Sequence, residues 1–403
     1  MRKISLMNAI SPKGTAVFDD TYVCEEKAEN PDAIMVRSAD LHDYAYPENL
    51  KAIARAGAGV NNIDLDGATD NGIVVFNTPG ANANAVKELV FAGLLLASRD
   101  LFHGMEWVNS QEGSPTLAKD VEKQKKKYAG NEIAGKTLGV VGLGAIGSKV
   151  ANTALHLDMN VLGYDPYLSV DSAWKLSRWI EHKTDLKDLF ANADFISLHL
   201  PLLDSTKGLV NKETIATMKD GVKILNFARG GLVNDDDILE ALDSGKVALY
   251  VTDFPDGKLA GHPGVIGLPH LGASSEESEE NCAVQAAKEL RAYLEEGNIV
   301  NSVNMPNVSL EMRMPYRVGV IHTNTPKVLS RITDILSKDD ANIENLLNKS
   351  RGDVAYTILD LDTAPAEESL EAIRALRQVM RVNCLKRIKR EHFYQRQHSA
   401  SRR

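Results

Sequence analysis

The chain has few of the features that mark secreted, membrane-spanning or nucleic-acid-binding proteins. Its only cysteines, Cys24, Cys282 and Cys384, lie far apart without a Cys-x-x-Cys motif, which argues against a disulfide framework or a metal site. No signal peptide is visible, and the longest apolar stretch, residues 89–97, is too short to span a bilayer. A net charge of −9 argues against general binding to nucleic acid or anionic membrane. We therefore expect a cytoplasmic protein.

The chain is long enough, at 403 residues with 43% hydrophobic residues, for two or three domains. Apolar runs alternate with Gly-rich turns and helical patterns, which predicts an α/β protein with two doubly wound sheets, the first flavodoxin-like. A linker and a βαββαβ, ferredoxin-like pattern follow. The expected parts are 1–98 with 283–304 (a discontinuous substrate domain), 99–282 (a Rossmann domain), 305–315 (a linker), 316–390 (a regulatory domain) and 391–403 (a basic tail).

Some local expectations follow from single residues. Asn82 is placed to cap the helix after it, and Pro326 stands where a helix of the last domain would begin. The Lys-rich segment 111–133 is interpreted as a solvated surface connection.

A glycine-rich turn follows the apolar run 138–141. Gly142, Gly144 and Gly147 have the G-x-G-x-x-G spacing, in which the glycines permit a tight turn, close approach of a pyrophosphate and close packing of helix on strand. Asp165 ends the next strand, 165 − 147 = 18 residues after the last glycine, where a carboxylate would hold a ribose hydroxyl and repel a 2′-phosphate. The pattern favours NAD over NADP; the alternative is a structural βαβ unit without a nucleotide.

Two polar residues at ends of predicted strands suit hydride transfer on an alcohol. Such a reaction needs a base for the hydroxyl proton, a cation for the carboxylate and carbonyl, and a group that sets the pKa of the base. His270 follows a strand-end proline and is the candidate base, and Arg229, which ends an apolar strand before two glycines, is the candidate cation. The alternatives are a structural histidine and a surface ion pair.

These residues lie in motifs that resemble the D-2-hydroxyacid dehydrogenases and, within them, the members that oxidise 3-phospho-D-glycerate. The motifs are Arg55-Ala-Gly-Ala-Gly-Val-Asn-Asn62, Asn77-Thr-Pro-Gly80, Gly142-Leu-Gly-Ala-Ile-Gly147, Asn226-Phe-Ala-Arg-Gly-Gly231 and Pro269-His-Leu-Gly-Ala-Ser274. The resemblance implies that Arg229 orients the substrate and His270 exchanges the proton. It places Arg37 and Arg55 near a substrate phosphate, with Gly57, Gly59 and Asn77 in the same loops. The implied NAD-binding residues are Gly142, Gly144, Ala145, Ile146, Gly147, Asp165, His199, Pro201, Ala228, Arg229, Asp253, His270 and Gly272.

The chain departs from the family pattern at the acid that pairs with the histidine. The family carries an Asp and, a few residues later, a Glu for this purpose, but no Glu occurs between Glu240 and Glu276. Asp253 matches the position that meets the nicotinamide. Asp256 is one candidate partner of His270, and the absence of any partner is the other.

The last domain resembles the amino-acid-sensing ACT domain. The resemblance implies that His322, Asn324 and Asn342 hold an amino acid, with L-serine as the possible effector, between two paired domains. The family's usual glycine after Pro326 is Lys327 here, so a domain that only dimerises is the alternative.

Together these features predict NAD-dependent oxidation of 3-phospho-D-glycerate to 3-phosphohydroxypyruvate, the first step of L-serine biosynthesis, by a homodimer or homotetramer. One alternative is another D-2-hydroxyacid dehydrogenase, acting on glycerate, hydroxypyruvate, lactate or glyoxylate. A second alternative is a non-catalytic regulator that senses NADH.

Overall fold

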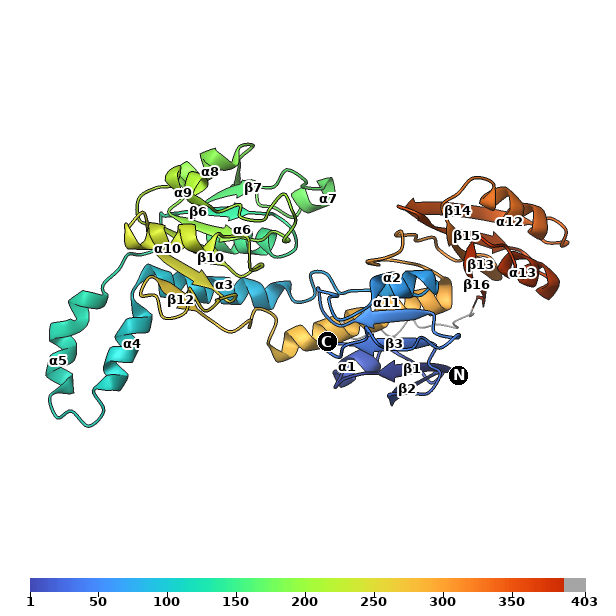
Figure 1. Cartoon of the computed structure of the whole chain (residues 1–403), viewed down its shortest axis with the longest axis horizontal. Coiled ribbons are helices and arrows are strands. Elements are labelled where there is room, and N and C mark those ends of the chain that lie inside the picture. The colour runs from blue at the N-terminus through green and yellow to red at the C-terminus, as the bar shows by residue number, and fades with distance from the viewer. Residues whose placement is uncertain (388–403) are drawn as a thin grey trace, which may run out of the picture. The chain divides into compact units, whose positions relative to one another are not determined.

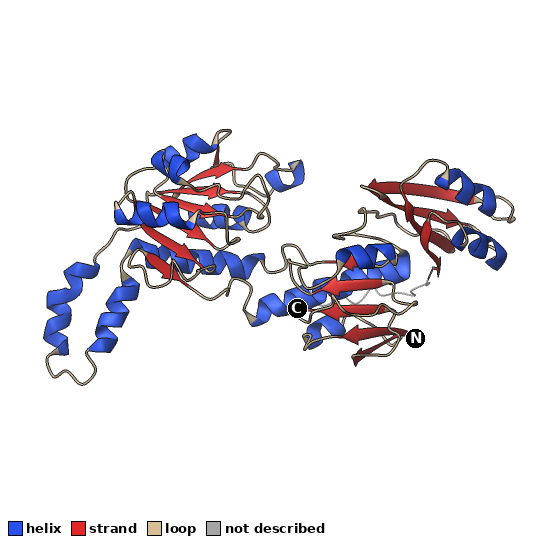
Figure 2. Ribbon diagram, viewed as in Figure 1, coloured by secondary structure: helices blue, strands red, loops and turns tan. Residues whose placement is uncertain are grey.

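A computed structural model describes residues 1–387. These residues form two compact units, one of Met1–Ala81 with the chain from Glu279 onward, the other of Asn82–Ser278 (Figures 1 and 2). The predicted basic tail, 391–403, lies outside the described residues. None of the helices within 1–387 is long and apolar enough to cross a membrane.

The first unit contains a parallel five-stranded sheet in the order β2-β1-β3-β4-β5, which is the predicted flavodoxin-like order. Its strands are β1 (Arg2–Leu6), β2 (Tyr22–Glu26), β3 (Ala33–Val36), β4 (Ala52–Arg55) and β5 (Val74–Phe76). Its helices are α1 (Pro12–Thr15), α2 (Leu65–Asp70) and most of α11 (Glu276–Glu296). The fully apolar strands β3 and β5 are buried throughout, as expected when both faces of a parallel sheet are covered.

The chain after α11 extends this sheet. Ser302 forms an antiparallel bridge with Phe76, and Val303 N–H donates to the Val75 carbonyl at 2.9 Å. Residues 302 and 303 therefore pair with β5 of the first sheet.

The second unit holds a parallel seven-stranded sheet in the order β12-β11-β10-β9-β6-β7-β8. The strands are β6 (Thr137–Val141), β7 (Asn160–Tyr164), β8 (Glu181–His182), β9 (Phe195–Leu198), β10 (Val222–Asn226), β11 (Val247–Thr252) and β12 (Val265–Gly267). The helices are α3 (Ala83–Ser98), α4 (Leu101–Ser110), α5 (Leu117–Gln124), η1 (Lys125–Tyr128), α6 (Gly147–Leu155), α7 (Val170–Ala173), α8 (Leu186–Asn192), α9 (Lys212–Ala216) and α10 (Asp235–Asp243).

The C-terminal part of the first unit is an antiparallel sheet in the order β14-β15-β13-β16. Its elements are β13 (Tyr316–Thr323), α12 (Val328–Leu336), β14 (Ile343–Arg351), β15 (Val354–Leu361), α13 (Glu367–Arg374) and β16 (Val379–Lys386). The βαββαβ order expected for a ferredoxin-like, ACT-like domain is confirmed.

Three local expectations differ from the structure. Asn82 makes no capping hydrogen bond, and α3, expected in the first domain, packs in the second unit, where a Cβ on Gly93 would lie 2.7 Å from Phe227. Segment 111–133 has no buried residue, as expected for a solvated surface, but it does not join the two units, because both of its ends lie in the second unit. There α4, α5 and η1 form a helical hairpin (Figure 1) in which the Trp107 and Tyr128 rings are 6.2 Å apart. Pro326 precedes α12, whose N-cap is Lys327.

Candidate functional site

The glycine turn after β6 lies where the strand order of the second sheet reverses, since β7 and β9 flank β6 on opposite sides. Gly142 has φ 91°, and a Cβ there would come within 2.6 Å of the His199 carbonyl oxygen. At Gly147 a Cβ would lie 1.9 Å from the Gly142 carbonyl oxygen, so the turn and α6 pack without room for a side chain. Gly144 differs, because a Cβ there would meet nothing within 4 Å. Its open side is the surface that a pyrophosphate would approach.

The N-terminus of α6 is available to an anion. Its N-cap residue, Ile146, supplies no side-chain hydrogen bond to the first turn. Unpaired N–H groups and the positive end of the helix dipole favour a phosphate at such a position. The residues present therefore fit the pyrophosphate of a dinucleotide.

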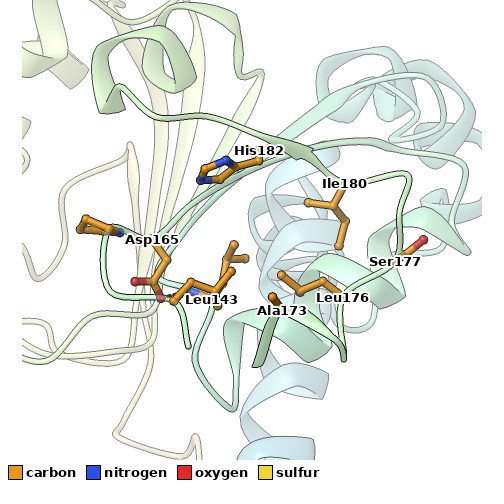
Figure 3. Close-up of a pocket in the computed structure, with 9 residues that line it drawn as sticks. Leu143, Asp165, Ala173, Leu176, Ser177, Ile180 and His182 are labelled. Atoms are coloured by element: carbon orange, nitrogen blue, oxygen red, sulfur yellow. Dashed lines mark hydrogen bonds between the residues drawn. The ribbon is translucent and has the colours of Figure 1, made fainter. Parts of the chain in front are cut away.

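A cavity of about 430 Å³ lies beside the glycine turn (Figure 3). It is lined by Leu143, Asp165, Pro166, Leu168, Ala173, Leu176, Ser177, Ile180 and His182. The Asp165 carboxylate is held in place by the N–H groups of Leu143 and Tyr167, each at 2.9 Å, and its remaining lone pairs can accept ribose hydroxyls. The apolar side chains suit a purine base.

The sequence predicted Asp165 but not the apolar residues that line the rest of this cavity. Leu168, Leu176 and Ile180 come from a stretch with one short helix, α7, and no regular hydrophobic period. The available signal was a group of apolar residues just after the ribose-binding acid.

Asp253 is the centre of a cluster of charged groups at the end of β11. Its side chain is buried, with Oδ2 3.3 Å from the Gly272 N–H and Oδ1 without a hydrogen-bond partner among the described residues. Burial raises the pKa of the Asp253 carboxyl, and the positive charges of His270 and Arg229 oppose that rise. The structure thus brings together three predicted site residues that lie in different motifs.

His270 is exposed and stacks on Phe254, with ring centroids 4.5 Å apart and planes tilted by 49°. The contact restricts the orientation of the imidazole while its edge stays accessible. The sequence did not predict this contact of Phe254 with His270. The position of Phe254 directly after Asp253 was the signal that could have indicated it.

Arg229 is also exposed, and its Nη1 donates to the Ala228 carbonyl at 2.6 Å. The buried Asn226 shapes the turn that carries it: Nδ2 donates to the Arg229 carbonyl at 2.9 Å and Oδ1 accepts the Ala228 N–H at 3.2 Å. The guanidinium is thereby presented at the strand end, able to form two parallel hydrogen bonds with a carboxylate.

Asp256 has other partners in the structure. Its Oδ1 accepts the N–H groups of Lys258 and Leu259 at 2.9 and 3.0 Å. Burial and the nearby Asp256 charge raise the pKa of the Asp235 carboxyl. Pairing of Asp256 with His270 stays a prediction, whereas Asp253 is the acid whose charge couples to the imidazole.

His199 supports the glycine turn from inside. Ser197 Oγ lies 2.9 Å from Nε2, Nδ1 is buried without a partner among residues 1–387, and burial lowers the pKa of the ring to about 4. The imidazole is therefore neutral at pH 7 and contributes shape rather than charge.

The predicted substrate loops of the first unit meet at the ends of β3, β4 and β5. Arg55 Nε donates to the Arg37 carbonyl at 3.0 Å, and Gly57, with φ 156°, leaves room for the guanidinium, since a Cβ would be 1.8 Å from Arg55 Nη1. Asn77 Nδ2 donates to the Ala58 carbonyl at 2.6 Å. Arg37, Arg55, Gly57 and Asn77 are therefore assembled in one place.

The three residues predicted to bind an effector are not assembled within one chain. His322 is 2% exposed; its Nδ1 lies 2.8 Å from the Thr323 carbonyl oxygen and its Nε2 lies 2.8 Å from the Thr357 hydroxyl. Asn324 and Asn342 lie at opposite ends of the sheet, about 20 Å apart for strands of this length. One ligand would touch both only if they came from two chains.

Comparisons with known proteins agree with this geometry. The family model "D-isomer specific 2-hydroxyacid dehydrogenase, NAD binding domain" matches residues 91–272. The chain is 38% identical to D-3-phosphoglycerate dehydrogenase of Bacillus subtilis over 70% of this chain and 53% of that protein. It is 31% identical to D-3-phosphoglycerate dehydrogenase 1 of Saccharomyces cerevisiae over 88% of this chain and 77% of that protein.

A solved structure is similar as well. The NAD⁺-bound 3-phosphoglycerate dehydrogenase of Entamoeba histolytica is 25% identical, with a TM-score of 0.57 over 75% of this chain and 98% of that chain. The chain spans about half the length of several curated relatives that it matches. Because the Saccharomyces relative is 31% identical and the chain covers 77% of it, and because the glycine turn accommodates a dinucleotide, the chain belongs to the D-isomer specific 2-hydroxyacid dehydrogenases, and its second unit is their NAD-binding domain.

Proposed function

We propose that the chain oxidises 3-phospho-D-glycerate to 3-phosphohydroxypyruvate. The observation that carries the proposal is the placement of Arg229, Asp253 and His270 at strand ends of the NAD-binding unit, with Asp253 bonded to Gly272 and Phe254 stacked on His270. The named relatives support the choice of substrate, and Arg37 with Arg55 supplies two guanidinium groups for a phosphate.

Each group has a distinct task in this reaction. NAD, when bound, accepts the hydride from the substrate carbon. His270 takes the hydroxyl proton, because its imidazole is exposed and oriented by Phe254. Arg229 holds the carboxylate and polarises the developing carbonyl. Asp253 lies buried beside both cations and stabilises the imidazolium that forms.

The test is an absorbance assay at 340 nm with NADH and 3-phosphohydroxypyruvate, with glyoxylate and pyruvate as comparison substrates. We expect NADH oxidation with the phosphorylated substrate and its loss in Arg229→Ala and His270→Ala. Turnover of glyoxylate or pyruvate alone would overturn the substrate assignment.

The second candidate is a D-2-hydroxyacid dehydrogenase for an unphosphorylated substrate. One observation favours it: Arg37 already forms an ion pair with Glu279, at 2.6 Å. This pair reduces the positive charge that is offered to a substrate phosphate. The same assay with hydroxypyruvate decides between the two candidates.

We also propose a homodimer formed through the hairpin of α4 and α5. Leu101, Phe102, Met105 and Val108 are exposed on α4 and give the hairpin an apolar surface. Sedimentation velocity of the parent and of Met105→Lys tests this; a variant that sediments like the parent would contradict it. A tetramer would need a second interface, for which pairing of the ACT-like domains is the candidate.

Two further proposals concern regulation and location. L-Serine would bind across two paired ACT-like domains, with Asn324 of one chain and Asn342 of the other; isothermal titration that gives no heat at millimolar L-serine would refute this. The three cysteines are free thiols, which supports a reducing compartment such as the cytoplasm.

A further inference from the structure

The loop that carries Arg37 is fixed by hydrogen bonds, apart from the end of the arginine side chain. Asn8, which follows β1, accepts three consecutive N–H groups through Oδ1, those of Arg37, Ser38 and Ala39, at 3.1, 3.1 and 2.9 Å. Arg55 Nε donates a hydrogen bond to the Arg37 carbonyl. None of these three N–H groups is therefore left to bind a substrate phosphate. The Arg37 guanidinium is the group of this loop that can recognise it.

The Arg37 guanidinium is held by an acid from a distant part of the chain. Its Nη2 lies 2.6 Å from Glu279 Oε1, in the first turn of α11. The two side chains are 40% and 41% exposed, so both are accessible to solvent. An ion pair with this exposure is weak, because water screens it and both side chains lose freedom. A phosphate group can therefore displace Glu279, although it does so against the repulsion of the carboxylate.

Glu279 and both arginines lie close together, because Arg37 pairs with Glu279 and Arg55 Nε donates to the Arg37 carbonyl. Burial raises the pKa of the Cys282 thiol, one turn after Glu279 on α11, and the charges of the three groups act on it in addition. An acid in this position acts on whatever anion approaches the two arginines.

We infer that Glu279 is a specificity-determining residue that weakens binding of a phosphorylated substrate. The inference rests on the proposed function in placing the phosphate at Arg37 and Arg55. By pairing with Arg37, Glu279 reduces the attraction for a dianion, while a substrate without a phosphate does not use this arginine and is unaffected. Glu279 thereby reduces the difference in affinity between phosphorylated and unphosphorylated 2-hydroxy acids.

The adjacent residue provides a matched control. Glu280 carries the same charge on the same turn of α11 but pairs with Lys13, at 2.7 Å. Glu279→Gln and Glu280→Gln remove the same charge from the same helix terminus, so their effects on the helix dipole are alike. Only the first releases Arg37.

Steady-state kinetics of the parent and the two variants, with NADH, test the inference. We expect Glu279→Gln to lower KM for 3-phosphohydroxypyruvate about fivefold, with kcat changed less than twofold and KM for glyoxylate unchanged. Glu280→Gln should match the parent with both substrates. An unchanged KM for the phosphorylated substrate in Glu279→Gln, or a fall shared with glyoxylate or with Glu280→Gln, would overturn it.

Failure of the proposed function gives a different pattern. If the parent reduces glyoxylate but not 3-phosphohydroxypyruvate, inorganic phosphate is added as a competitive inhibitor of glyoxylate reduction. A lower inhibition constant in Glu279→Gln than in the parent and in Glu280→Gln would support the role of Glu279 toward phosphate. Equal inhibition constants in all three proteins would overturn it.

Discussion

Glu289 makes the stability of the first unit depend on pH. The side chain is 7% exposed on α11; Oε1 accepts the Gln285 and Asn301 amides at 3.0 and 2.7 Å, and Oε2 has no partner among the described residues. No cation is among the groups that act on its ionisation, so burial dominates and raises the pKa of Glu289 from 4.5 to about 7. The folded protein therefore holds this proton at pH values where the unfolded chain has released it.

The size of the effect follows from the pKa change. Because the pKa of Glu289 rises from 4.5 to about 7, and each tenfold change in proton affinity corresponds to about 1.4 kcal/mol, the effect on stability is about 3 kcal/mol. Between pH 4.5 and 7 the folded state binds more protons than the unfolded state, so the free energy of unfolding falls as the pH rises. The loss is complete above pH 7, where the carboxylate is charged and still buried.

Glu289→Gln removes the charge and nearly preserves the shape. We expect the variant to unfold with a free energy close to the parent's at pH 5 and to exceed it by up to about 3 kcal/mol at pH 8.5. Urea unfolding followed by circular dichroism at both pH values measures this difference. Glu295→Gln is the control, because Glu295 is also buried on α11 but pairs with Arg291 at 3.0 Å. The reasoning is refuted if Glu289→Gln differs from the parent by the same amount at pH 5 and at pH 8.5.

Five other substitutions have expected outcomes. Gly144→Ala leaves the thermal midpoint unchanged, since its Cβ has open space, but weakens NADH binding at least tenfold by filling the phosphate approach, as fluorescence titration would show. Lys327→Gly stabilises by about 0.5–1 kcal/mol in thermal unfolding, because Lys327 has φ 70°. Asp360→Asn lowers the free energy of unfolding in urea by about 3–5 kcal/mol, because it leaves the charge of its fully buried partner, Arg317, without a counter-charge. Asp253→Asn lowers kcat/KM at least tenfold. Asp256→Asn changes kcat/KM less than twofold, because the Asp256 carboxylate caps a turn. Equal losses in the two variants would favour Asp256 as the partner of His270.

The fold follows closely from local patterns in the sequence. The predicted strands at 33–36, 195–198 and 265–268 are present at nearly those bounds, because a strand covered on both faces is rich in apolar residues. Boundaries set by single residues were less predictable. Asn82 makes no cap and Pro326 does not open a helix, since tertiary packing decided the chain path at both points.

The candidate site was predictable where a motif requires a particular backbone. Gly142 and Gly147 stand where any side chain would collide with a carbonyl oxygen, and that demand is written in local sequence. Contacts between distant segments carry no such signature. The sequence separates Glu279 from Arg37 by more than two hundred residues, and nothing near either one indicates the other.

The sequence by itself determined the parallel sheets and the dinucleotide-binding turn, because strand periodicity and glycine spacing act over a few residues. Only the tertiary structure decided which groups surround them. Asp253 accepts from the Gly272 N–H near His270, Asn8 accepts the N–H groups of the Arg37 loop, and Glu289 is buried with no cation among the described groups that act on its ionisation. The physical reason is that burial and electrostatic coupling depend on distance in space, which neighbours in sequence do not reveal.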